Sequence, residues 1–180
     1  MDIVHTRQPD PCYTQLMNEQ IAFVNYSEAY HSQMVSLLEE FHMYLVHIDP
    51  MRRLRIQPGY GEAELKKILQ QTTELEGLFL LAVAGEEIAG FVTTTIYRQT
   101  PEDLLGTNPS NIGRLTNLYI SPLHRQKGLG TTLVHKAEEY VLSRGCDVMK
   151  IEVFVPNDAA KKLYEKLGYQ PRDIDQIKKL

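Results

Sequence analysis

Apolar residues follow two different periods along this chain. Runs of about four to eight β-branched, aromatic and aliphatic residues are typical of strands, and apolar spacing near 3.6 is typical of amphipathic helices. The short runs predict strands over residues 20–26, 78–84, 88–97, 113–121 and 147–155. The longer spacing predicts helices over residues 28–46, 62–75, 129–144 and 158–167.

Turn-forming residues separate these elements. Ser27 is a suitable N-cap, and Asp49 with the following proline should end the first helix. Gly90 suggests a bulge, whereas Gly145 and Gly168 suit the position after a helix C-terminus. The polar segment 98–112 is predicted to be a long hairpin loop, either disordered or involved in substrate binding. Residues 169–180 should add a short strand, although Ile174, Ile177 and Leu180 also fit a helical turn.

The order of the elements predicts an α/β fold with a mixed sheet. Strands 113–121 and 147–155 are joined through a helix and should be parallel, whereas strands 78–84, 88–97 and 113–121 are linked as antiparallel hairpins. Helices should then cover both faces. Residues 20–180 are predicted to form one domain, preceded by a polar leader over residues 1–19.

Composition narrows the class of protein. A chain of 180 residues with 43% apolar residues can bury a full core, and its net charge of −4 argues against a nucleic-acid partner. Cys12 and Cys146 are far apart and lack metal-ligand spacing, so neither a metal nor a disulfide is expected. Neither a signal peptide nor an apolar run of about 18 residues is evident. The expected location is therefore the cytoplasm, away from membranes.

Residues 117–131 read as the end of a strand, a turn and the first turn of a helix. Pro122 ends the strand, and Gly128 and Gly130 precede the helical pattern. Such a junction offers unpaired backbone N–H groups to an anion, and glycine lets phosphate oxygens approach the main chain. Lys127 precedes Gly128 instead of following it, which excludes a Walker loop, and Leu133 stands where a dinucleotide fingerprint needs a third glycine.

A second motif lies between residues 157 and 169. Asn157 is a good N-cap, but its side chain could also face an amide of a ligand. Tyr164 lies two helical turns further along the same face, so the two side chains can border one groove. Taken singly, a plain cap and a core tyrosine would explain them.

Together the two motifs resemble those of the GNAT superfamily of acetyl-CoA-dependent N-acetyltransferases. Arg125-x-x-Gly128-x-Gly130 is similar to the family's pyrophosphate loop, and Asn157-x-x-Ala160-x-x-x-Tyr164-x-x-x-Gly168-Tyr169 is similar to its second signature. The resemblance covers about residues 20–172. It implies a mixed, mostly antiparallel sheet in which the parallel strands 113–121 and 147–155 splay apart.

The resemblance also implies residue roles. Backbone N–H groups from Gln126 to Thr131 would hold the pyrophosphate, with Arg125, Lys127 and Lys161 as candidates for the outer phosphates. The main chain around Leu118 would pair with the pantetheine arm, and the Leu118 N–H would polarise the thioester carbonyl. Tyr164 would give a proton to the leaving thiolate. The implied cofactor-binding residues are Leu118, Tyr119, Ile120, Arg125, Gln126, Lys127, Gly128, Leu129, Gly130, Thr131, Asn157 and Tyr164.

The general base is where this chain departs from many relatives. They carry an acidic residue on the strand before the glycine loop, but here Arg114, Thr116 and Asn117 occupy the candidate positions. Glu152 is a candidate base that would act directly or through water. The first helix carries four more candidates, although its histidines suit a structural role better: Glu39, Glu40, His42 and His47.

The predicted activity is transfer of an acetyl group from acetyl-CoA to a primary amine by direct attack in a ternary complex. A non-catalytic acyl-CoA-binding or sensing module is a different interpretation, and an enzyme using a longer acyl-CoA is a third. The acceptor stays open, although Glu39, Glu40 and Asp49 could line its entrance and so favour a cation. The resemblance also leaves open a homodimer.

Overall fold

The computed structural model describes residues 20–178, in which five strands and four α-helices alternate with short 3-10 turns. The strands are β1 (Ile21–Asn25), β2 (Phe79–Ala84), β3 (Glu87–Arg98), β4 (Asn111–Ile120) and β5 (Val148–Ile151). The helices are α2 (His31–Ile48), α3 (Tyr60–Glu74), α4 (Leu129–Ser143) and α5 (Asp158–Lys166). The 3-10 turns are η1 (Glu28–Tyr30), η2 (Asp103–Leu105) and η3 (Pro122–His124).

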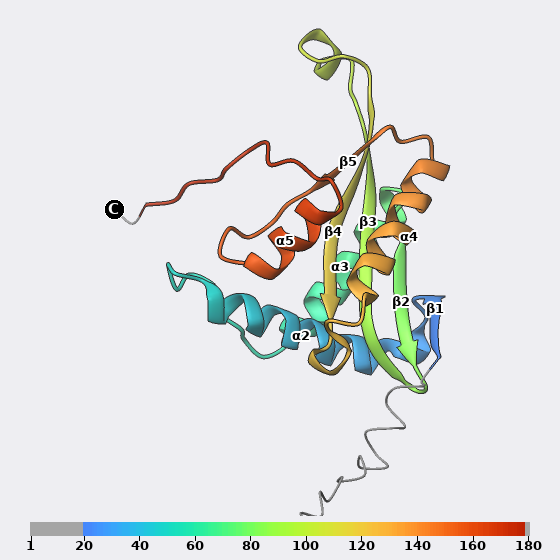
Figure 1. Ribbon diagram of the computed structural model, residues 1–180, viewed down its shortest axis with the longest axis vertical. Helices are drawn as coiled ribbons and strands as arrows, with labels where there is room; N and C mark the ends of the chain where they lie inside the picture. Colours follow the sequence, from blue (N-terminus) through green and yellow to red (C-terminus); the bar gives the residue numbers. More distant parts are fainter. Residues whose placement is uncertain (1–19, 179–180) are drawn as a thin grey trace, which may run out of the picture.

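The strands form one sheet in the order β1-β2-β3-β4-β5 (Figure 1). Strands β1 to β4 pair antiparallel with their neighbours, and β4 pairs parallel with β5. The mixed sheet predicted from the element order is therefore confirmed. The connection from β4 to β5 runs through α4, as parallel pairing requires.

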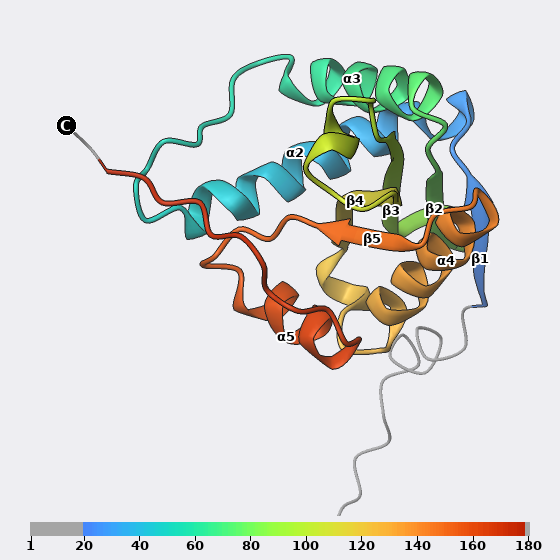
Figure 2. The same ribbon diagram turned by 90° about the horizontal axis from the view of Figure 1, so that it is seen from above.

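Helices cover both faces of the sheet, α2 and α3 on one and α4 and α5 on the other (Figure 2). Alternating side chains along the strands supply the two cores. Phe91 and Leu81 pack with Met34 and Leu38 of α2 beneath the first pair of helices. Val92 and Leu115 pack with Leu133 of α4 and Tyr164 of α5 on the opposite face. Each apolar helix stripe predicted from the sequence thus has a buried partner.

Strands β4 and β5 separate after a short paired segment. Their pairing ends at Leu115 and Ile151. Next to this point β4 bulges, because Thr93 of β3 pairs with Asn117 and Thr94 with Leu115, which leaves Thr116 as the extra residue. A bulge bends its strand and increases its twist. The β4 edge beyond Leu115 therefore faces an opening instead of β5, and the predicted splay is confirmed.

The fifth strand is shorter than the sequence predicts. The apolar pattern predicts a strand over residues 147–155, but β5 ends at Ile151. Beyond it the bulged β4 no longer offers a partner, and the Asn157 N–H donates to the Phe154 carbonyl in a turn that leads into α5 (2.7 Å). An apolar run therefore continues past the point where pairing stops, which the pattern of residues alone does not reveal.

The ends of other elements also differ from the predictions. The first helix is preceded by η1, and Ser27 is the N-cap of η1 instead of α2; its carbonyl accepts the Tyr30 N–H, but its side chain makes no cap hydrogen bond. The bulge predicted at Gly90 has Ala89 as its extra residue. Position 90 has room only for glycine, because a Cβ there would lie 2.7 Å from the Tyr119 carbonyl oxygen. Gly145 and Gly168 have φ of 79° and 89°, which confirms both C-terminal positions.

The predicted long loop between β3 and β4 is a structured projection that extends away from α5 (Figure 1). The Ser110 N–H donates to the Gln99 side chain (2.6 Å), and the Thr100 N–H donates to the Asp103 carboxylate (2.8 Å). Tyr97 donates to the same carboxylate (2.5 Å). These bonds hold the loop in one conformation, so disorder, one of the two predictions for it, is not supported.

The predicted last strand is absent from residues 169–178, and so is the helical turn that the same residues could have formed. The Tyr169 N–H donates to the Tyr164 carbonyl and closes α5 (3.0 Å). Ile174 and Ile177 remain 73% and 53% exposed, so little apolar burial offsets the cost of ordering this segment in a sheet. Residues 1–19, with Cys12 and the predicted leader, lie outside the described residues.

Candidate functional site

The opening between β4 and β5 contains a cavity of about 260 Å³. Five elements contribute to its wall: α2, α3, β4, the segment after β5, and α5. The lining residues are Leu38, Phe41, His42, Leu45, Tyr60, Glu64, Leu115, Thr116, Asn117, Leu118, Glu152, Val153, Phe154, Asn157, Ala160 and Tyr164. The predicted site residues Leu118, Glu152, Asn157 and Tyr164 therefore border one space, together with His42, another candidate base, and the β4 positions Thr116 and Asn117.

The free edge of β4 supplies backbone groups to this space. The Ser121 N–H donates to the Ala89 carbonyl (2.9 Å) and so faces β3. Because N–H and C=O groups alternate in direction along a strand, Leu118 and Ile120 direct theirs toward the opening. The Ile120 carbonyl accepts the Arg125 Nε–H (2.9 Å). The carbonyl of Ile120 is thus already bonded, and only its N–H is left for a ligand. Both backbone groups of Leu118 face the opening, beyond the last β4–β5 pair.

The loop after β4 exposes a row of backbone donors. Over residues 20–178, no N–H from Gln126 to Thr131 donates to a backbone carbonyl. Gln126 and Gly128 have φ of 61° and 81°, so the chain turns sharply before α4 begins at Leu129. These N–H groups lie at the positive end of the α4 dipole and can bind an anion such as a pyrophosphate.

Only one of the two glycines of this loop is required by its backbone conformation. A Cβ on Gly128 would meet no atom within 4 Å, so Gly128 is needed for its positive φ. A Cβ on Gly130 would lie 3.4 Å from the Leu163 side chain of α5. That distance is an ordinary van der Waals contact, so α5 packs beside the start of α4 without a need for glycine at position 130, and this packing brings the second motif beside the loop.

Arg125 packs over aromatic rings beside the loop. Its guanidinium carbon lies 5.3 Å from the centre of the Tyr119 ring and 5.6 Å from that of Tyr44. Together with the bond to the Ile120 carbonyl, these contacts fix the loop against α2. Lys161 forms an ion pair with Asp158 (2.8 Å), and Lys127 is exposed. The binding of the outer phosphates by these three side chains stays a prediction.

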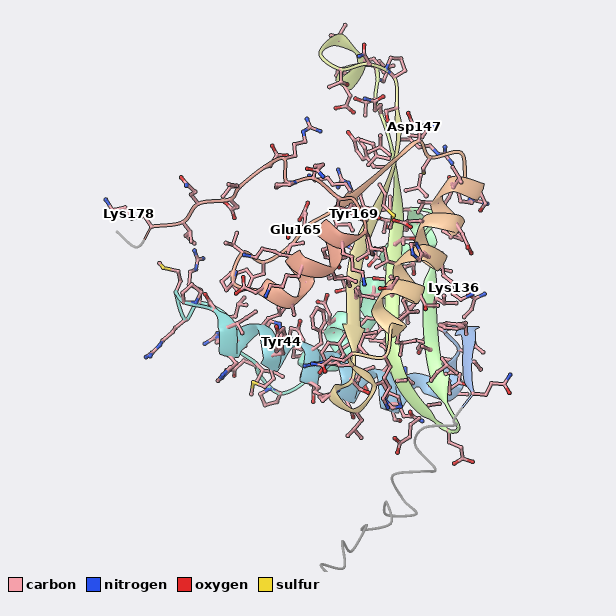
Figure 3. The ribbon with its side chains drawn as sticks, in the orientation of Figure 1. Tyr44, Lys136, Asp147, Glu165, Tyr169 and Lys178 are labelled. Carbon is pink, nitrogen blue, oxygen red and sulfur yellow. The ribbon has the colours of Figure 1, made fainter. Side chains whose placement is uncertain are left out.

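Asn157 connects α5 to α2 and also caps α5. Its Oδ1 accepts the Ala160 N–H (3.2 Å), which confirms the N-cap, and the Tyr44 hydroxyl (3.1 Å). Figure 3 labels Tyr44 on α2, where that helix passes below α5 in the view. The amide oxygen is therefore occupied by protein donors. Only the amide nitrogen is left for a ligand.

Tyr164 presents a neutral hydroxyl at the cavity wall. The side chain is 7% exposed, and its ring meets that of Tyr169 edge-on at 5.8 Å between centres. Burial raises the pKa of Tyr164 to about 12 because the phenolate would lose its hydration. The proton therefore stays on the oxygen across the physiological range, and the hydroxyl can act as a donor.

Of the three β4 positions considered for an acidic base, two carry the neutral residues Thr116 and Asn117, and the third carries Arg114. The Thr93 and Thr116 hydroxyls are 2.7 Å apart, and the Asn117 amide donates to Thr93 (2.9 Å). Glu152 borders the same cavity from the segment after β5, but its side chain is 81% exposed and lies 3.5 Å from Lys150 Nζ. A carboxylate so exposed can exchange protons with water freely.

Three of the lining residues from α2 and α3 are polar: His42, Tyr60 and Glu64. His42 donates its Nε2–H to the Arg55 carbonyl (3.0 Å) and stacks on Tyr60, with ring centres 4.1 Å apart. Burial, with a contribution from the Glu64 carboxylate, raises the pKa of Tyr60 to about 12. Tyr60 and Glu64 were missed in the sequence because they belong to no motif. Only the packing of α3 against α2 brings them to the cavity.

The other acidic residues considered for the entrance lie elsewhere. Asp49 is buried, and its carboxylate accepts backbone N–H groups of the following loop, from Met51 (2.9 Å), Arg53 (2.6 Å) and Leu54 (2.9 Å). Its predicted place at the entrance is wrong. Glu39, Glu40 and His47 are also absent from the lining residues, so the first helix contributes His42 alone among its four candidate bases.

The described residues carry neither a metal-ligand cluster nor a membrane-spanning helix. Between residues 20 and 178, no three His, Cys, Asp or Glu side chains gather as metal ligands would. Within the same range, every helix is too short or too polar to cross a bilayer.

Residues 33–169 match the model of the Acetyltransferase (GNAT) family, so the chain belongs to that family. It is 26% identical over 99 residues to an uncharacterized N-acetyltransferase of Methanocaldococcus jannaschii, a match that covers 55% of this chain and 41% of the relative. It is 32% identical over 92 residues to N-alpha-acetyltransferase 30 of Xenopus laevis, covering 51% of this chain and 31% of the relative. The chain thus spans less than half the length of these two curated relatives.

A solved structure supports the same fold. The structure of AAC(6′)-Iy in complex with the bisubstrate analogue CoA-S-monomethyl-acetylneamine superimposes with a TM-score of 0.62 over 89% of this chain and 99% of that one. The two sequences are 18% identical, a level at which the likeness concerns the fold.

Proposed function

We propose that this protein transfers the acetyl group of acetyl-CoA to a primary amine by direct attack within a ternary complex. The observation that carries the proposal is the unpaired β4 edge, which joins the N–H row of residues 126–131 to the cavity that Leu118 and Tyr164 border. Family membership supports the same donor. A pantetheine arm laid along this edge would lead from the anion site to the cavity.

Most of the proposed contacts to the coenzyme come from backbone groups and not from side chains. Backbone N–H groups of Gln126, Lys127, Gly128, Leu129, Gly130 and Thr131 would bind the pyrophosphate. Leu118 and the N–H of Ile120 would pair with pantetheine, as in addition of a strand. The predicted coenzyme contact of Tyr119 is not supported, because its N–H and C=O face β3, as the Ser121 N–H does, and its side chain is buried in the core on the α2 face. Asn157 would offer its amide nitrogen.

The reaction requires two proton movements. An amine with a pKa of about 10.4 must lose a proton before it attacks the thioester carbon, which costs about 4.6 kcal/mol at pH 7. Glu152, or water that it orders, is proposed to accept that proton. The Leu118 N–H would stabilise the oxyanion as the carbon becomes tetrahedral. The carbon–sulfur bond then breaks, and the sulfur leaves as a thiolate hydrogen-bonded by Tyr164.

The high pKa of Tyr164 defines what the hydroxyl can do. A thiol has a pKa of about 8.5, so complete proton transfer from a phenol near 12 would be uphill by roughly 5 kcal/mol. Tyr164 is therefore proposed to donate a hydrogen bond to the developing thiolate. Net protonation would come later, from solvent or from the proton released by the amine.

A thiol-release assay tests this proposal. The purified chain is mixed with acetyl-CoA and a panel of primary amines, and free CoA and the N-acetyl product are both quantified. Equal amounts of the two products are expected. Tight acetyl-CoA binding without release for any amine would instead support a sensing module. Turnover with butyryl-CoA but not acetyl-CoA would point to a longer acyl donor.

A further inference from the structure

Carboxylates, and neither lysine nor arginine, line the cavity among the described residues. The two carboxylates are those of Glu64 and Glu152. The N–H groups that suit an anion lie at the start of α4, outside this lining. Because like charges repel most strongly where water is partly excluded, an acceptor bearing a carboxylate beside its amine is disfavoured here.

Glu64 is the better sheltered of these two carboxylates. Its side chain is 20% exposed, compared with 81% for Glu152. Both Glu64 oxygens accept from Lys67 Nζ, at 3.2 and 3.3 Å, and that lysine side chain is 59% exposed. Because the Lys67 side chain is largely exposed, its pair with Glu64 contributes little stability, and an ammonium inside the cavity can compete with Lys67 for Glu64.

The neighbouring wall suits the carbon chain of a cation. His42 and Tyr60 stack as a flat pair, and the bond from His42 to the Arg55 carbonyl holds the pair in place. Phe41 and Phe154 border the same cavity. Aromatic faces attract cations and also cover methylene groups without a need for polar partners.

We propose that the acceptor is a small cation with at least two amines and no carboxylate beside either of them. One amine reaches the thioester beside Leu118 while a second, as an ammonium, binds Glu64. This inference rests on the proposed acetyl transfer and names its substrate class. Linear aliphatic diamines and amino sugars share this chemistry, and the following experiment separates them.

Initial rates are measured for the purified chain with acetyl-CoA and matched acceptors: 1,4-diaminobutane, 1-aminobutane, lysine, an amino sugar with several amines, and a peptide with a neutral N-terminal residue. We expect kcat/KM for 1,4-diaminobutane or the amino sugar to exceed that for 1-aminobutane at least tenfold, with lysine no better than 1-aminobutane. Whichever of 1,4-diaminobutane and the amino sugar has the higher kcat/KM shows whether the acceptor has a linear aliphatic or a sugar skeleton.

Two substitutions on α3 test whether the preference for a second amine depends on Glu64. Glu64→Gln should raise KM for the preferred polyamine about tenfold, while leaving kcat/KM for 1-aminobutane within about twofold. Glu62→Gln is the matched control, because the Glu62 side chain is 61% exposed and bonded to His31, away from the cavity. It should leave every rate unchanged. Acetyl-CoA affinity, measured for both variants, verifies that each is folded.

The outcomes separate the two proposals. Thiol release from none of the acceptors would contradict the proposed function. Release that is as fast with 1-aminobutane, lysine or the peptide as with the polyamines would overturn only the inference about the acceptor. So would equal KM values for Glu64→Gln and the wild-type chain.

Discussion

Replacing Tyr164 by phenylalanine removes one hydroxyl from the cavity wall and little else. The ring remains packed in the core beneath α4 and α5, and the hydroxyl donates no hydrogen bond to another residue of the described range. Stability at neutral pH should therefore change by less than about 1 kcal/mol. A hydrogen bond to a charged group contributes about 1.5–3 kcal/mol, so turnover should fall roughly tenfold to hundredfold.

Rates of thiol release at saturating acetyl-CoA give kcat, and calorimetry gives the affinity for acetyl-CoA. The affinity should be nearly unchanged, because the hydroxyl is proposed to interact with the sulfur as the thiolate forms. A Tyr164→Phe variant with turnover within about twofold of wild type would refute the proposed role of this residue.

The same variant tests the pKa. A folded-state pKa near 12, against about 10 in the unfolded chain, means that the folded state retains the Tyr164 proton longer as the pH rises. Stability is therefore unaffected by this shift below about pH 10 and falls by roughly 3 kcal/mol as the pH rises from about 10 to 12. Chemical denaturation of Tyr164→Phe should show a shallower loss of stability over this range. Identical alkaline slopes would contradict the burial argument.

Three further predictions concern other parts of the site. Gly128→Ala should weaken CoA binding at least tenfold, whereas Gly145→Ala, at a similar φ with an equally open surrounding, should not; calorimetry of both compares them, and equal losses would mean a general folding effect. Asp49→Asn should destabilise the fold above about pH 4 and flatten the acid side of the stability profile, because the loop N–H groups, chiefly that of Leu54, lower the pKa of Asp49 and its stabilisation is lost as pH falls through that value. Asn157→Ala should cost about 1 kcal/mol of cap stability, whereas Asn157→Ser should retain most of it; thermal unfolding decides, and equal midpoints for the two variants would contradict the cap.

Features with local causes could be predicted from the sequence. A positive φ at Gly128, Gly145 and Gly168 follows from glycine at the end or beginning of a helical pattern, and the Asn157 cap follows from its position before an apolar stripe. The parallel arrangement of β4 and β5 follows from the helix between them. These elements depend on residues close in sequence, so their pattern contained the necessary information.

Features that depend on partners distant in sequence could not be predicted. The end of β5 at Ile151 is set by the Thr116 bulge in β4, which exists only relative to the β3 register. The cavity wall of His42, Tyr60 and Glu64 depends on how α3 packs against α2. The sequence placed Asp49 at the entrance of the acceptor site because the three residues whose N–H groups bind its carboxylate form no recognisable motif in the loop that follows.

A crystal structure with CoA bound tests the central claim most directly. We expect the pyrophosphate on the N–H groups of residues 126–131, the pantetheine along the free β4 edge, and the thiol between the Leu118 N–H and the Tyr164 hydroxyl. A CoA molecule bound elsewhere, or one whose thiol lies outside the cavity between β4 and β5, would contradict the account.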